Sequence, residues 1–478
     1  MTDFIPPYPP RPPKPLSVIE LLRRGTDNFL DVWEEKAFEY QTMSMQLLAR
    51  QIFICNSPDT VRYAFVTQAQ NFERKSPQMR HALEPLLGDG LFISDGETWK
   101  QRRRMVAPVL HTTRLSRFAP TMVEAAAELG AAWARLPQGT TVDILKAMAQ
   151  LTAEIIGRTI FGQALGAERT REVVEAFSDY QKHVDQRDLT SLLGLPAWIP
   201  RRQGGKIGRS AARIHAILDG VIAELKAQGG NDSVVQMLRR TAGEHGGLDD
   251  TALRNEAAVI FMAGHETTAN CLAWAWYLLS QAPEVEARLH AELDAVLGNR
   301  PPALADVPRL DYTRAIIEET LRLYPPVPLL ARQSVEADTI RGRPVKAGAL
   351  LIVVPWLLHR HRHFWRKPDH FMPDRFLPGS PDAPKKYTYV PFSIGPRICA
   401  GLNFGLTEAI ICLATLARTA RLRLVPGTPV QPVCRLTLRP GDTLPMTVVA
   451  RPHRTTKHPA TPAPAPASAL AGCPFGHG

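Results

Sequence analysis

The chain has 478 residues, of which 45% are apolar, and its 57 lysines and arginines exceed its 46 aspartates and glutamates by a formal net charge of +11. This composition excludes an intrinsically disordered protein, which has few apolar residues and a dominant charge, and the length allows a core that can bury a large ligand. Six scattered cysteines exclude a disulfide scaffold, and no CxxC pair suggests zinc. We therefore expect a reduced, cytoplasmic protein.

The chain is predicted to consist of a Pro-rich leader (1–16), one folded domain (17–450) and an extended, mobile Pro/Ala-rich tail (451–478), because alternating prolines support neither helix nor sheet. Helical patterns within the domain lie near 121–135, 143–161, 171–184, 209–227, 249–281, 283–297, 312–323 and 402–419. Strand-like patterns are short and lie at 51–56, 350–354 and within 421–450. The fold class is mainly α with a minor β portion.

The segment 256–279 is apolar on nearly all sides, yet His265 and Glu266 lie at its middle. A charge is expensive in lipid, so this pattern favours a helix through the centre of a large core over a membrane span. Asp249 or Asp250 can cap its start and Pro283 marks its end. The leader likewise lacks a signal peptide or the roughly 20 apolar residues of an anchor, and we expect no transmembrane segment.

One cysteine stands in the segment Phe392-Ser-Ile-Gly-Pro-Arg-Ile-Cys-Ala-Gly401, just before an apolar helical run. A helix N-terminus stabilises a thiolate, so Cys399 can serve as a metal ligand or a nucleophile. Gly395 and Gly401 would let a planar group approach the backbone, and Arg397 could pair with a carboxylate on that group. The alternative is a buried structural cysteine in a tight turn.

The segment matches FxxGxRxCxG, the haem-binding signature of the cytochrome P450 family, and the chain resembles that family from about residue 70 to residue 440. The resemblance implies the P450 fold, with haem b between the central helix and the helix after the cysteine loop. Cys399 would be the axial ligand of the haem iron, and its thiolate would favour O–O cleavage. Phe392 would lie against the ligand, Gly395 and Gly401 would keep the loop close, and Arg397 would pair with a propionate.

The central segment Ala263-Gly-His-Glu-Thr-Thr268 is similar to the family's AGxET motif. By this resemblance Gly264 opens the helix where oxygen must fit, Thr267 hydrogen-bonds at the oxygen site, and Glu266 relays protons to it. The alternative for Thr267 is a hydroxyl that bonds back to its own helix, which is common for threonine.

Three further motifs appear in the family's order. Glu319 and Arg322 match ExxR, and the resemblance completes them with Arg375 of the segment PDRF as a structural ionic trio. Trp99 and Arg103 match WxxxR, where the family's third helix meets the haem propionates, and Arg332 corresponds to another propionate arginine. The ExxR pattern is weak alone, because ion pairs three residues apart occur on many solvated helices. The alternative for any one of the propionate arginines is a surface arginine, but this does not explain all of them together.

The resemblance implies a haem-thiolate monooxygenase that inserts one oxygen atom of O2 into a C–H or C=C bond. Electrons would come from a separate ferredoxin or flavodoxin with its NAD(P)H-dependent reductase, because no flavin or dinucleotide motif is present. The basic charge would then dock an acidic protein partner; it is not clustered as nucleic-acid binding requires. By resemblance to the pocket regions of the family, the candidate pocket residues are Met79, Leu83, Leu86, Val259, Ala263, Leu329, Leu330 and Leu436. Nearly all are aliphatic, which predicts an apolar, sizeable substrate such as a fatty acid, a terpenoid or a steroid-like molecule.

Two rival functions stay open: a haem-thiolate isomerase or peroxygenase that needs no reductant, and a non-catalytic haem sensor or carrier. The first usually lacks an acid–threonine pair such as Glu266 and Thr267, and the second would not need one. The alternating segment His359 to His363 resembles a metal-binding strand, but its arginines favour a solvated or partner-facing segment. Residues 192–199, with Trp198, could form a lid, touch a membrane or pack as an ordinary loop. Cys473 and Pro474 are expected in the mobile tail.

Overall fold

The computed structural model describes residues 4–47, 50–183, 205–228, 233–244, 247–434 and 436–451. Helices predominate, which confirms the predicted fold class. The helices are α1 (Val18–Asp27), α2 (Pro58–Arg62), α3 (Pro77–Leu87), α4 (Gly96–Val109), α5 (Leu115–Ala134), α6 (Ile144–Phe161), α7 (Gly166–His183), α9 (Gly205–Gln228), α10 (Val234–Glu244), α11 (Asp250–Gln281), α12 (Pro283–Leu297), α13 (Asp311–Leu323), α14 (Pro355–Leu358) and α15 (Leu402–Thr419).

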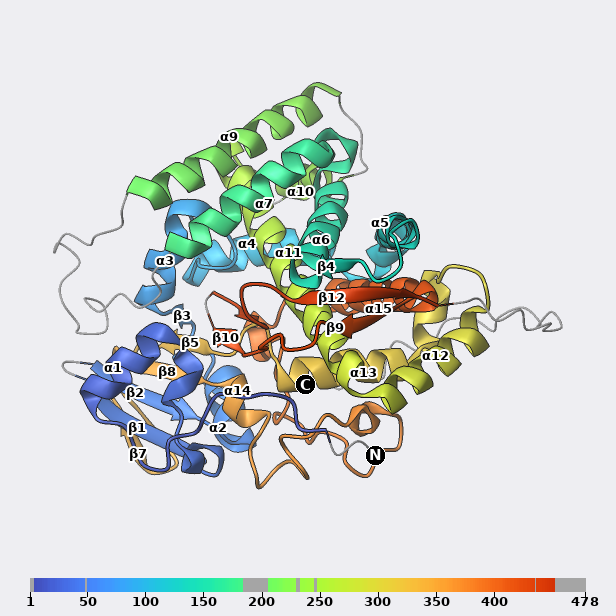
Figure 1. Ribbon diagram of the computed structural model, residues 1–478. Coiled ribbons are helices and arrows are strands. Elements are labelled where there is room, and N and C mark those ends of the chain that lie inside the picture. The colour runs from blue at the N-terminus through green and yellow to red at the C-terminus, as the bar shows by residue number, and fades with distance from the viewer. Residues whose placement is uncertain are drawn as a thin grey trace.

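The strands are short and lie mainly beside the helical part, at the lower left of Figure 1. They are β1 (Thr42–Leu47), β2 (Arg50–Cys55), β3 (Arg74–Lys75), β4 (Thr141–Asp143), β5 (Leu330–Gln333), β6 (Asp338–Ile340), β7 (Arg343–Val345), β8 (Leu350–Val353), β9 (Ala420–Leu424), β10 (Val433–Cys434), β11 (Leu438–Arg439) and β12 (Pro445–Ala450). The largest sheet has the order β1-β2-β8-β5-β3. Its β3–β5 pairing sets Lys75 opposite Arg332 and so brings two cations together.

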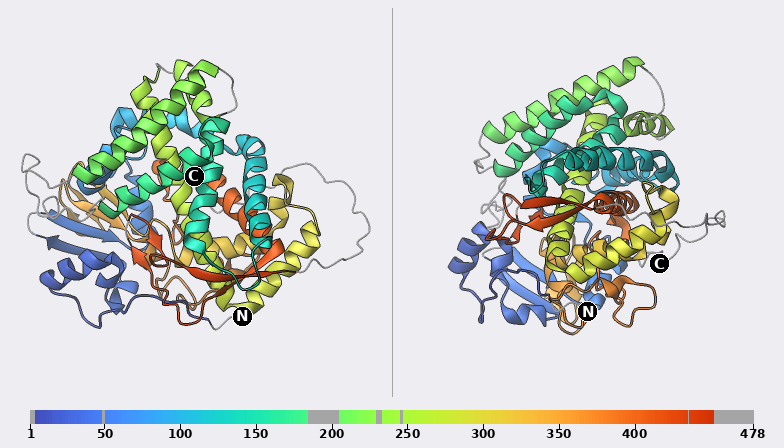
Figure 2. Two further views of the ribbon diagram at one scale, coloured as in Figure 1. Left: turned by 45° about the horizontal axis from the view of Figure 1, so that its top comes forward. Right: turned by 45° about the vertical axis from the view of Figure 1, so that its right-hand side comes forward.

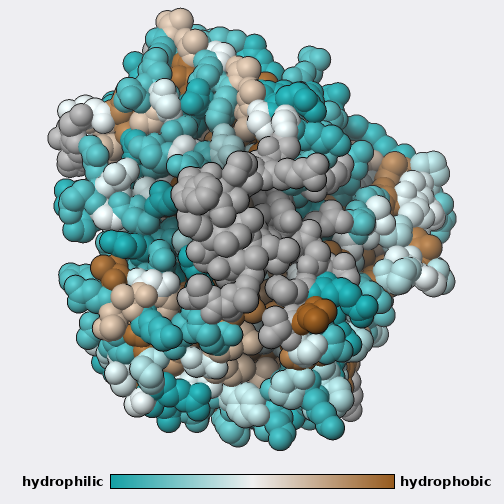
Figure 3. All heavy atoms as spheres, turned by 90° about the vertical axis from the view of Figure 1, so that its left-hand side faces the viewer, coloured by the Kyte–Doolittle hydropathy of each residue, from teal (hydrophilic) through white to brown (hydrophobic). Residues whose placement is uncertain are grey.

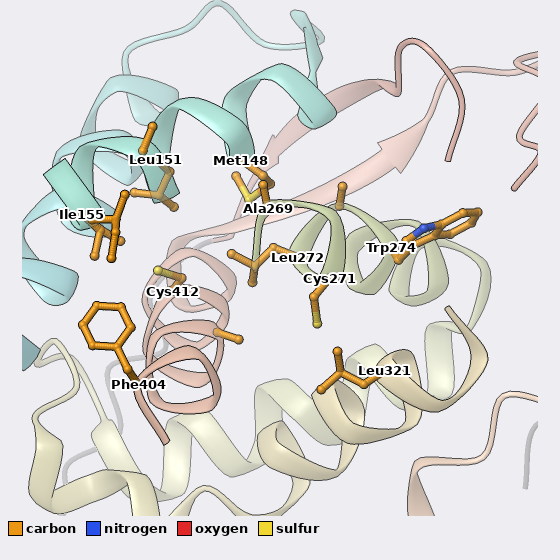
Figure 4. Close-up of a cluster of buried hydrophobic side chains, with 14 of the residues drawn as sticks. Met148, Leu151, Ile155, Ala269, Cys271, Leu272, Trp274, Leu321, Phe404 and Cys412 are labelled. Atoms are coloured by element: carbon orange, nitrogen blue, oxygen red, sulfur yellow. The ribbon is translucent and has the colours of Figure 1, made fainter. Parts of the chain in front are cut away.

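The central helix α11 runs through the middle of the molecule, between α6 and α15 (Figures 1 and 2). Asp249 caps it as predicted, because its Oδ1 accepts the Ala252 N–H at 2.7 Å. The next helix, α12, begins at Pro283, in agreement with the predicted end of α11. Apolar side chains of α6, α11 and α15 point into one shared core (Figure 4). This packing explains why the sequence of α11 is apolar on nearly all sides.

The leader lies against the folded part, which therefore begins before residue 17. The Tyr324 hydroxyl donates to the Pro7 carbonyl at 2.7 Å, and the Phe371 N–H donates to the Phe4 carbonyl at 3.1 Å. Arg11 forms an ion pair with Asp369. Composition alone missed this contact, because prolines prevent regular structure but not the docking of an extended chain. The predicted tail from 452 onward lies outside the described residues.

The face at the left of Figure 1 is mostly hydrophilic among its coloured residues, with hydrophobic residues scattered over it (Figure 3). Ile19, at 80% exposure, is the most exposed large hydrophobic side chain among the described residues. Scattered exposed residues of this kind are normal on a protein surface. Within the described part of the chain, no helix has the length and apolar character that crossing a membrane requires.

Candidate active site

A cavity of about 260 Å³ lies where α11, α15, α4 and β5 meet. Cys399, in the loop before α15, and Thr267, on α11, both line this cavity. Most of the remaining wall is apolar and includes Leu91, Phe92 and Val259. The cavity therefore brings together residues that the sequence separates by more than 300 positions.

The cysteine loop is held by its own backbone. The Cys399 N–H donates to the Phe392 carbonyl at 2.9 Å, which closes the loop over a short 3₁₀ turn, η8 (Gly395–Arg397). Gly395 has φ +69°, and a Cβ built on it would lie 1.9 Å from the Phe65 carbonyl oxygen. At Gly401 the nearest atom to such a Cβ is the Cys399 sulfur at 4.0 Å. Gly395 thus serves protein packing, whereas the open space beside Gly401 faces the cavity.

Replacing Gly395 by alanine is expected to lower the free energy of unfolding by about 3 kcal/mol, because overpacking and a left-handed backbone each cost about 1–3 kcal/mol. The clash is with backbone, which cannot give way as a flexible side chain can. Urea unfolding followed by circular dichroism measures the change. Gly401→Ala is the matched control and should lose less than about 1 kcal/mol. Equal losses in the two variants would contradict this assignment.

The Cys399 side chain is exposed toward the cavity and enclosed by protein elsewhere. This burial raises the pKa of its thiol, whereas the Gly401 N–H and the Arg103 guanidinium lower it. The helix α15 starts three residues later, so the sulfur lies near a helix N-terminus as predicted. The other cavity cysteine, Cys271 on α11, is fully buried and has a thiol pKa raised to about 12.

One edge of the cavity is strongly cationic. Lys75, Arg103, Arg332 and Arg397 all line it. Burial and the neighbouring Arg397 lower the pKa of Arg332 to about 9, and burial with Arg332 and Arg397 lowers the pKa of Lys75 well below its usual value. Clustered, buried cations need anions for stability. The two propionates of a haem fit this edge.

Part of the counter-charge comes from Asp95, the residue before α4. It accepts a 3.0 Å hydrogen bond from Arg397 and also binds the main-chain N–H of Lys75 at 2.9 Å. The Arg397 guanidinium lies 4.5 Å from the Trp99 ring centroid, which brings two predicted haem-edge residues together. Sequence reasoning missed Lys75 and Asp95, because neither belongs to a motif and only the β3–β5 pairing places Lys75 here.

The central helix contributes Ala263, Gly264, Thr267 and Thr268 to the wall. The Thr267 hydroxyl donates to the Ala263 carbonyl at 2.7 Å, as in the alternative considered from the sequence. A Cβ at Gly264 would lie 2.9 Å from two atoms of Ile156 on α6. The helix α11 is continuous at Gly264, and the glycine lets α6 pack closely there. Because Gly264 also lines the cavity, its role at the oxygen site stays a prediction.

Glu266 lies on a different side of α11 and does not line the cavity. Its carboxylate accepts hydrogen bonds from Thr437 at 2.6 Å and from Arg439 at 2.9 Å, and from Gln181. The Arg439 contact is also an ion pair, and Glu266 is 7% exposed. No sequence signal pointed to these three partners, which come from α7 and from the region of β11.

The ionic trio is fully buried. Arg322 donates to both oxygens of Glu319 at 2.7 Å, and the Arg375 Nε donates to the same carboxylate at 3.3 Å. All three side chains are 0% exposed. Arg322 also donates to the carbonyl of His359, which ties α13 to the chain beyond α14. The trio therefore cross-links these segments of the chain.

The segment from His359 to His363 is only partly solvated: Arg362 and His363 are exposed as expected, whereas His359, Arg360 and His361 are buried. His359 is 0% exposed, and its Nε2 accepts the Val390 N–H at 2.9 Å. The Arg360 guanidinium, 3.7 Å from the Trp356 ring centroid, is 2% exposed. Alternation misled at the start of the segment because His359 and Arg360 have buried partners, Val390 and Trp356, that the pattern does not show. The described residues contain no cluster of metal-binding side chains.

The predicted pocket residues divide into two groups. Met79, Val259, Ala263, Leu329 and Leu330 line the cavity. Leu83 and Leu86 are 0% and 1% exposed in the main core, and Leu436 packs half-buried against that core. These three do not line the cavity. Leu83 and Leu86 are buried on α3, which packs against α9 and α11, and Leu436 lies in the connection between β10 and β11. The segment 192–199, with Trp198, and the pair Cys473 and Pro474 lie outside the described residues.

Comparison with known proteins agrees with this geometry. The cytochrome P450 family profile matches residues 6–443. The chain belongs to the cytochrome P450 family. It is therefore a haem-binding P450 monooxygenase. Similar proteins include cyclooctatin synthase of Streptomyces melanosporofaciens, 32% identical over 84% of this chain and 86% of the relative.

Two other relatives extend this picture. Cyclooctat-9-en-7-ol 5-monooxygenase of Streptomyces melanosporofaciens is 32% identical and covers 72% of this chain and 74% of its own. Human cytochrome P450 4V2 is 31% identical, over 74% of this P450 and 71% of the relative. Among solved structures, the heme domain of cytochrome P450DA superposes with a TM-score of 0.79 at 24% identity, over 94% of this chain and 98% of that one. This last likeness confirms the fold.

Proposed function

We propose that this P450 hydroxylates or epoxidises a bulky apolar substrate, of the fatty acid, terpenoid or steroid-like classes, in the cavity between Thr267 and Cys399. The apolar wall facing these two residues carries the proposal, because such walls select hydrophobic ligands and exclude water. The name cyclooctat-9-en-7-ol 5-monooxygenase describes oxidation of a cyclic unsaturated alcohol. That name favours a cyclic, terpenoid-like compound over a fatty acid.

The residues present suit haem b. We propose that Cys399 supplies the axial sulfur and that Trp99, Arg103, Arg332 and Arg397, joined by Lys75, hold the two propionates. The haem, when bound, supplies the activation of O2. Phe392 and Gly401 line the cavity beside the sulfur and leave room for a flat group. Gly395 holds the loop on Phe65, and Gly264 keeps α6 against α11.

We propose that Thr267 and Glu266 manage the protons that oxygen reduction consumes. The Thr267 hydroxyl lies at the cavity wall, where it can exchange its bond to Ala263 for one to a ligand or a water. Glu266 is held by Arg439, so it can supply protons only by changing hydrogen-bond partners.

We also propose that electrons arrive from a ferredoxin or flavodoxin served by an NAD(P)H-dependent reductase. Lys100 and Arg104 are exposed on α4 and flank Arg103, whose charge acts on the Cys399 sulfur. A basic surface at this point suits an acidic protein partner. A cytoplasmic location is proposed with it, supported by the five cysteines without disulfides in the described chain.

The experiment that tests the proposal combines the purified haem-loaded protein with a surrogate ferredoxin, its reductase and NADPH. The substrates are cyclic terpenoid alcohols, sterols and fatty acids, and both NADPH consumption and oxygenated product are measured. Product coupled to NADPH supports the proposal. Turnover with peroxide alone, or rearrangement without reductant, indicates a peroxygenase or an isomerase, and no turnover in any arm indicates a haem carrier.

Replacing Thr267 by alanine is expected to divert electrons from product to hydrogen peroxide. The variant loses the hydroxyl at the cavity wall but keeps the backbone of α11, so the product formed per NADPH should fall at least about tenfold. Peroxide and product are measured in the same reaction. Thr267→Ser keeps a hydroxyl and should retain most of the coupling. Unchanged coupling in the alanine variant would show that this hydroxyl has no role in proton management.

A further inference from the structure

The segment from Gly88 to Leu91 crosses one turn of α11 in close contact. Gly88 has φ +52°, and a Cβ there would lie 2.1 Å from the Asn255 Nδ2. A Cβ on Gly90 would lie 2.7 Å from the Val259 Cγ2. Two side chains are therefore missing where the backbone meets the helix, so the distance between the segment and α11 is fixed by direct contact.

A buried carboxylate holds the same segment from the helix side. Glu256 is 1% exposed, and its two oxygens accept the main-chain N–H of Leu91 at 3.0 and 3.2 Å. The Arg102 Nε lies 3.5 Å from this carboxylate, while the Arg102 Nη2 donates to Asp89 at 2.7 Å. The two carboxylates thus share one guanidinium, and the Asn255 amide donates to Asp89 at 3.2 Å.

This arrangement is costly as a purely structural device. Burial raises the pKa of Glu256 to about 7, although Arg102 and the Leu91 N–H lower it. A well-packed apolar residue would often serve stability equally well or better, because a buried ion pair must offset the desolvation of both charges. The carboxylate does what no apolar side chain can do, since it binds a specific main-chain N–H and fixes the position of Leu91.

The residues fixed in this way belong to the active-site wall. Leu91 and the next residue, Phe92, line the cavity, and so does Val259, which lies three residues after Glu256 on α11. Beyond Phe92, the N–H groups of Ile93 and Ser94 donate to the Gly90 carbonyl at 3.1 Å. The segment is therefore a short rigid unit whose start is attached to α11 and whose apolar part faces the cavity.

We propose that Glu256 is a positioning residue that sets the distance of Leu91 and Phe92 from α11 and thereby determines how tightly bulky apolar ligands are held in the cavity. The proposal rests on the proposed function only in that such ligands occupy this cavity. Glu256 does not itself line the cavity, so it acts through the Leu91 backbone. Small ligands that do not reach the wall should not depend on it.

The test uses two iron-binding probes on the full-length, haem-loaded protein: imidazole, and phenylimidazole, which adds an apolar ring that reaches the wall. Binding is titrated by visible absorption. Glu256→Leu is expected to raise the Kd of phenylimidazole about fivefold while the Kd of imidazole stays within about twofold. Glu256→Gln keeps an acceptor for the Leu91 N–H and should bind both probes like the parent.

A second variant tests the proposal without changing a charge. Gly90→Ala pushes the segment away from Val259 and should reproduce the selective loss of phenylimidazole, even if Glu256→Leu fails to load haem. Amide hydrogen exchange should be faster at Leu91 in both variants. The control Glu286→Leu removes another buried carboxylate, one paired with Arg423, and should leave both Kd values unchanged.

The outcomes are separable. A selective loss of phenylimidazole in Glu256→Leu or Gly90→Ala, with faster exchange at Leu91, supports the positioning role. Equal changes for both probes, or unchanged phenylimidazole binding in every variant, overturn it. Failure of the parent protein to bind imidazole at all would instead contradict the proposed haem site, which keeps the two proposals distinct.

Discussion

Cys399→Ser is expected to abolish the thiolate signature of the haem, because a hydroxyl is a far weaker donor to iron than a thiolate. The reduced protein under carbon monoxide should lose the strongly red-shifted Soret band of thiolate-bound haem, and NADPH-dependent product should fall below detection. The cysteine loop itself should persist, because the hydrogen bond from the Cys399 N–H to the Phe392 carbonyl does not involve the sulfur. Visible absorption and circular dichroism on the same sample measure both effects.

The matched control is Cys271→Ser, because Cys271 also lines the cavity. Burial raises the pKa of this thiol to about 12, so it stays protonated at neutral pH. The control should therefore keep the red-shifted band. Retention of that band in Cys399→Ser, or its loss in Cys271→Ser, would show that Cys399 is not the iron ligand. Either result would remove the basis of the proposed site.

Glu319→Gln is expected to lower the free energy of unfolding by about 3–5 kcal/mol, because it leaves Arg322 and Arg375 buried without a counter-charge. The loss should also reduce haem retention, since Arg322 ties α13 to the chain that leads to the cysteine loop. Chemical unfolding at pH 7 measures the stability, and the ratio of Soret to protein absorbance measures the haem content.

The neighbouring Glu318 supplies a matched control. It is 5% exposed on the same helix, forms no ion pair with the residues that the structure describes, and has a pKa raised to about 7 by burial. Glutamine resembles its protonated form, and a raised pKa means that ionisation costs stability as pH rises through 7. Glu318→Gln should therefore be neutral or slightly stabilising at pH 8. Similar losses in the two variants would argue against a special role for the trio.

Local sequence signals predicted the parts of the site that are continuous in the chain. The cysteine loop combines glycines, an arginine and a helix start within ten residues, and the AGHETT segment interrupts an otherwise apolar helix. Both features can be recognised before the fold is known, because glycines in a loop and polar residues within an apolar helix are each contained in one short stretch of sequence. The long helices α5, α6, α11 and α15 were predicted for the same reason.

The missed parts depend on contacts between distant segments. Lys75 joins the cationic edge only through its pairing with Arg332, and Glu266 meets Arg439 only because β11 lies beside α11. The helix α4, which carries Trp99 and Arg103, was not predicted from periodicity, because four of its fourteen residues are lysine or arginine and the apolar face is narrow. The WxxxR motif, rather than hydrophobic periodicity, pointed to this helix.

The docked leader has a practical consequence for handling the protein. Pro7 and Phe4 bind Tyr324 and Phe371, and Tyr324 stacks on Trp274 of α11 with ring centroids 3.5 Å apart. Trimming the first dozen residues as if they were dispensable would thus uncover an aromatic pair that reaches the central helix. An affinity tag is better fused ahead of residue 1, with a flexible spacer, so that the contacts of Phe4 and Pro7 with the folded part are kept.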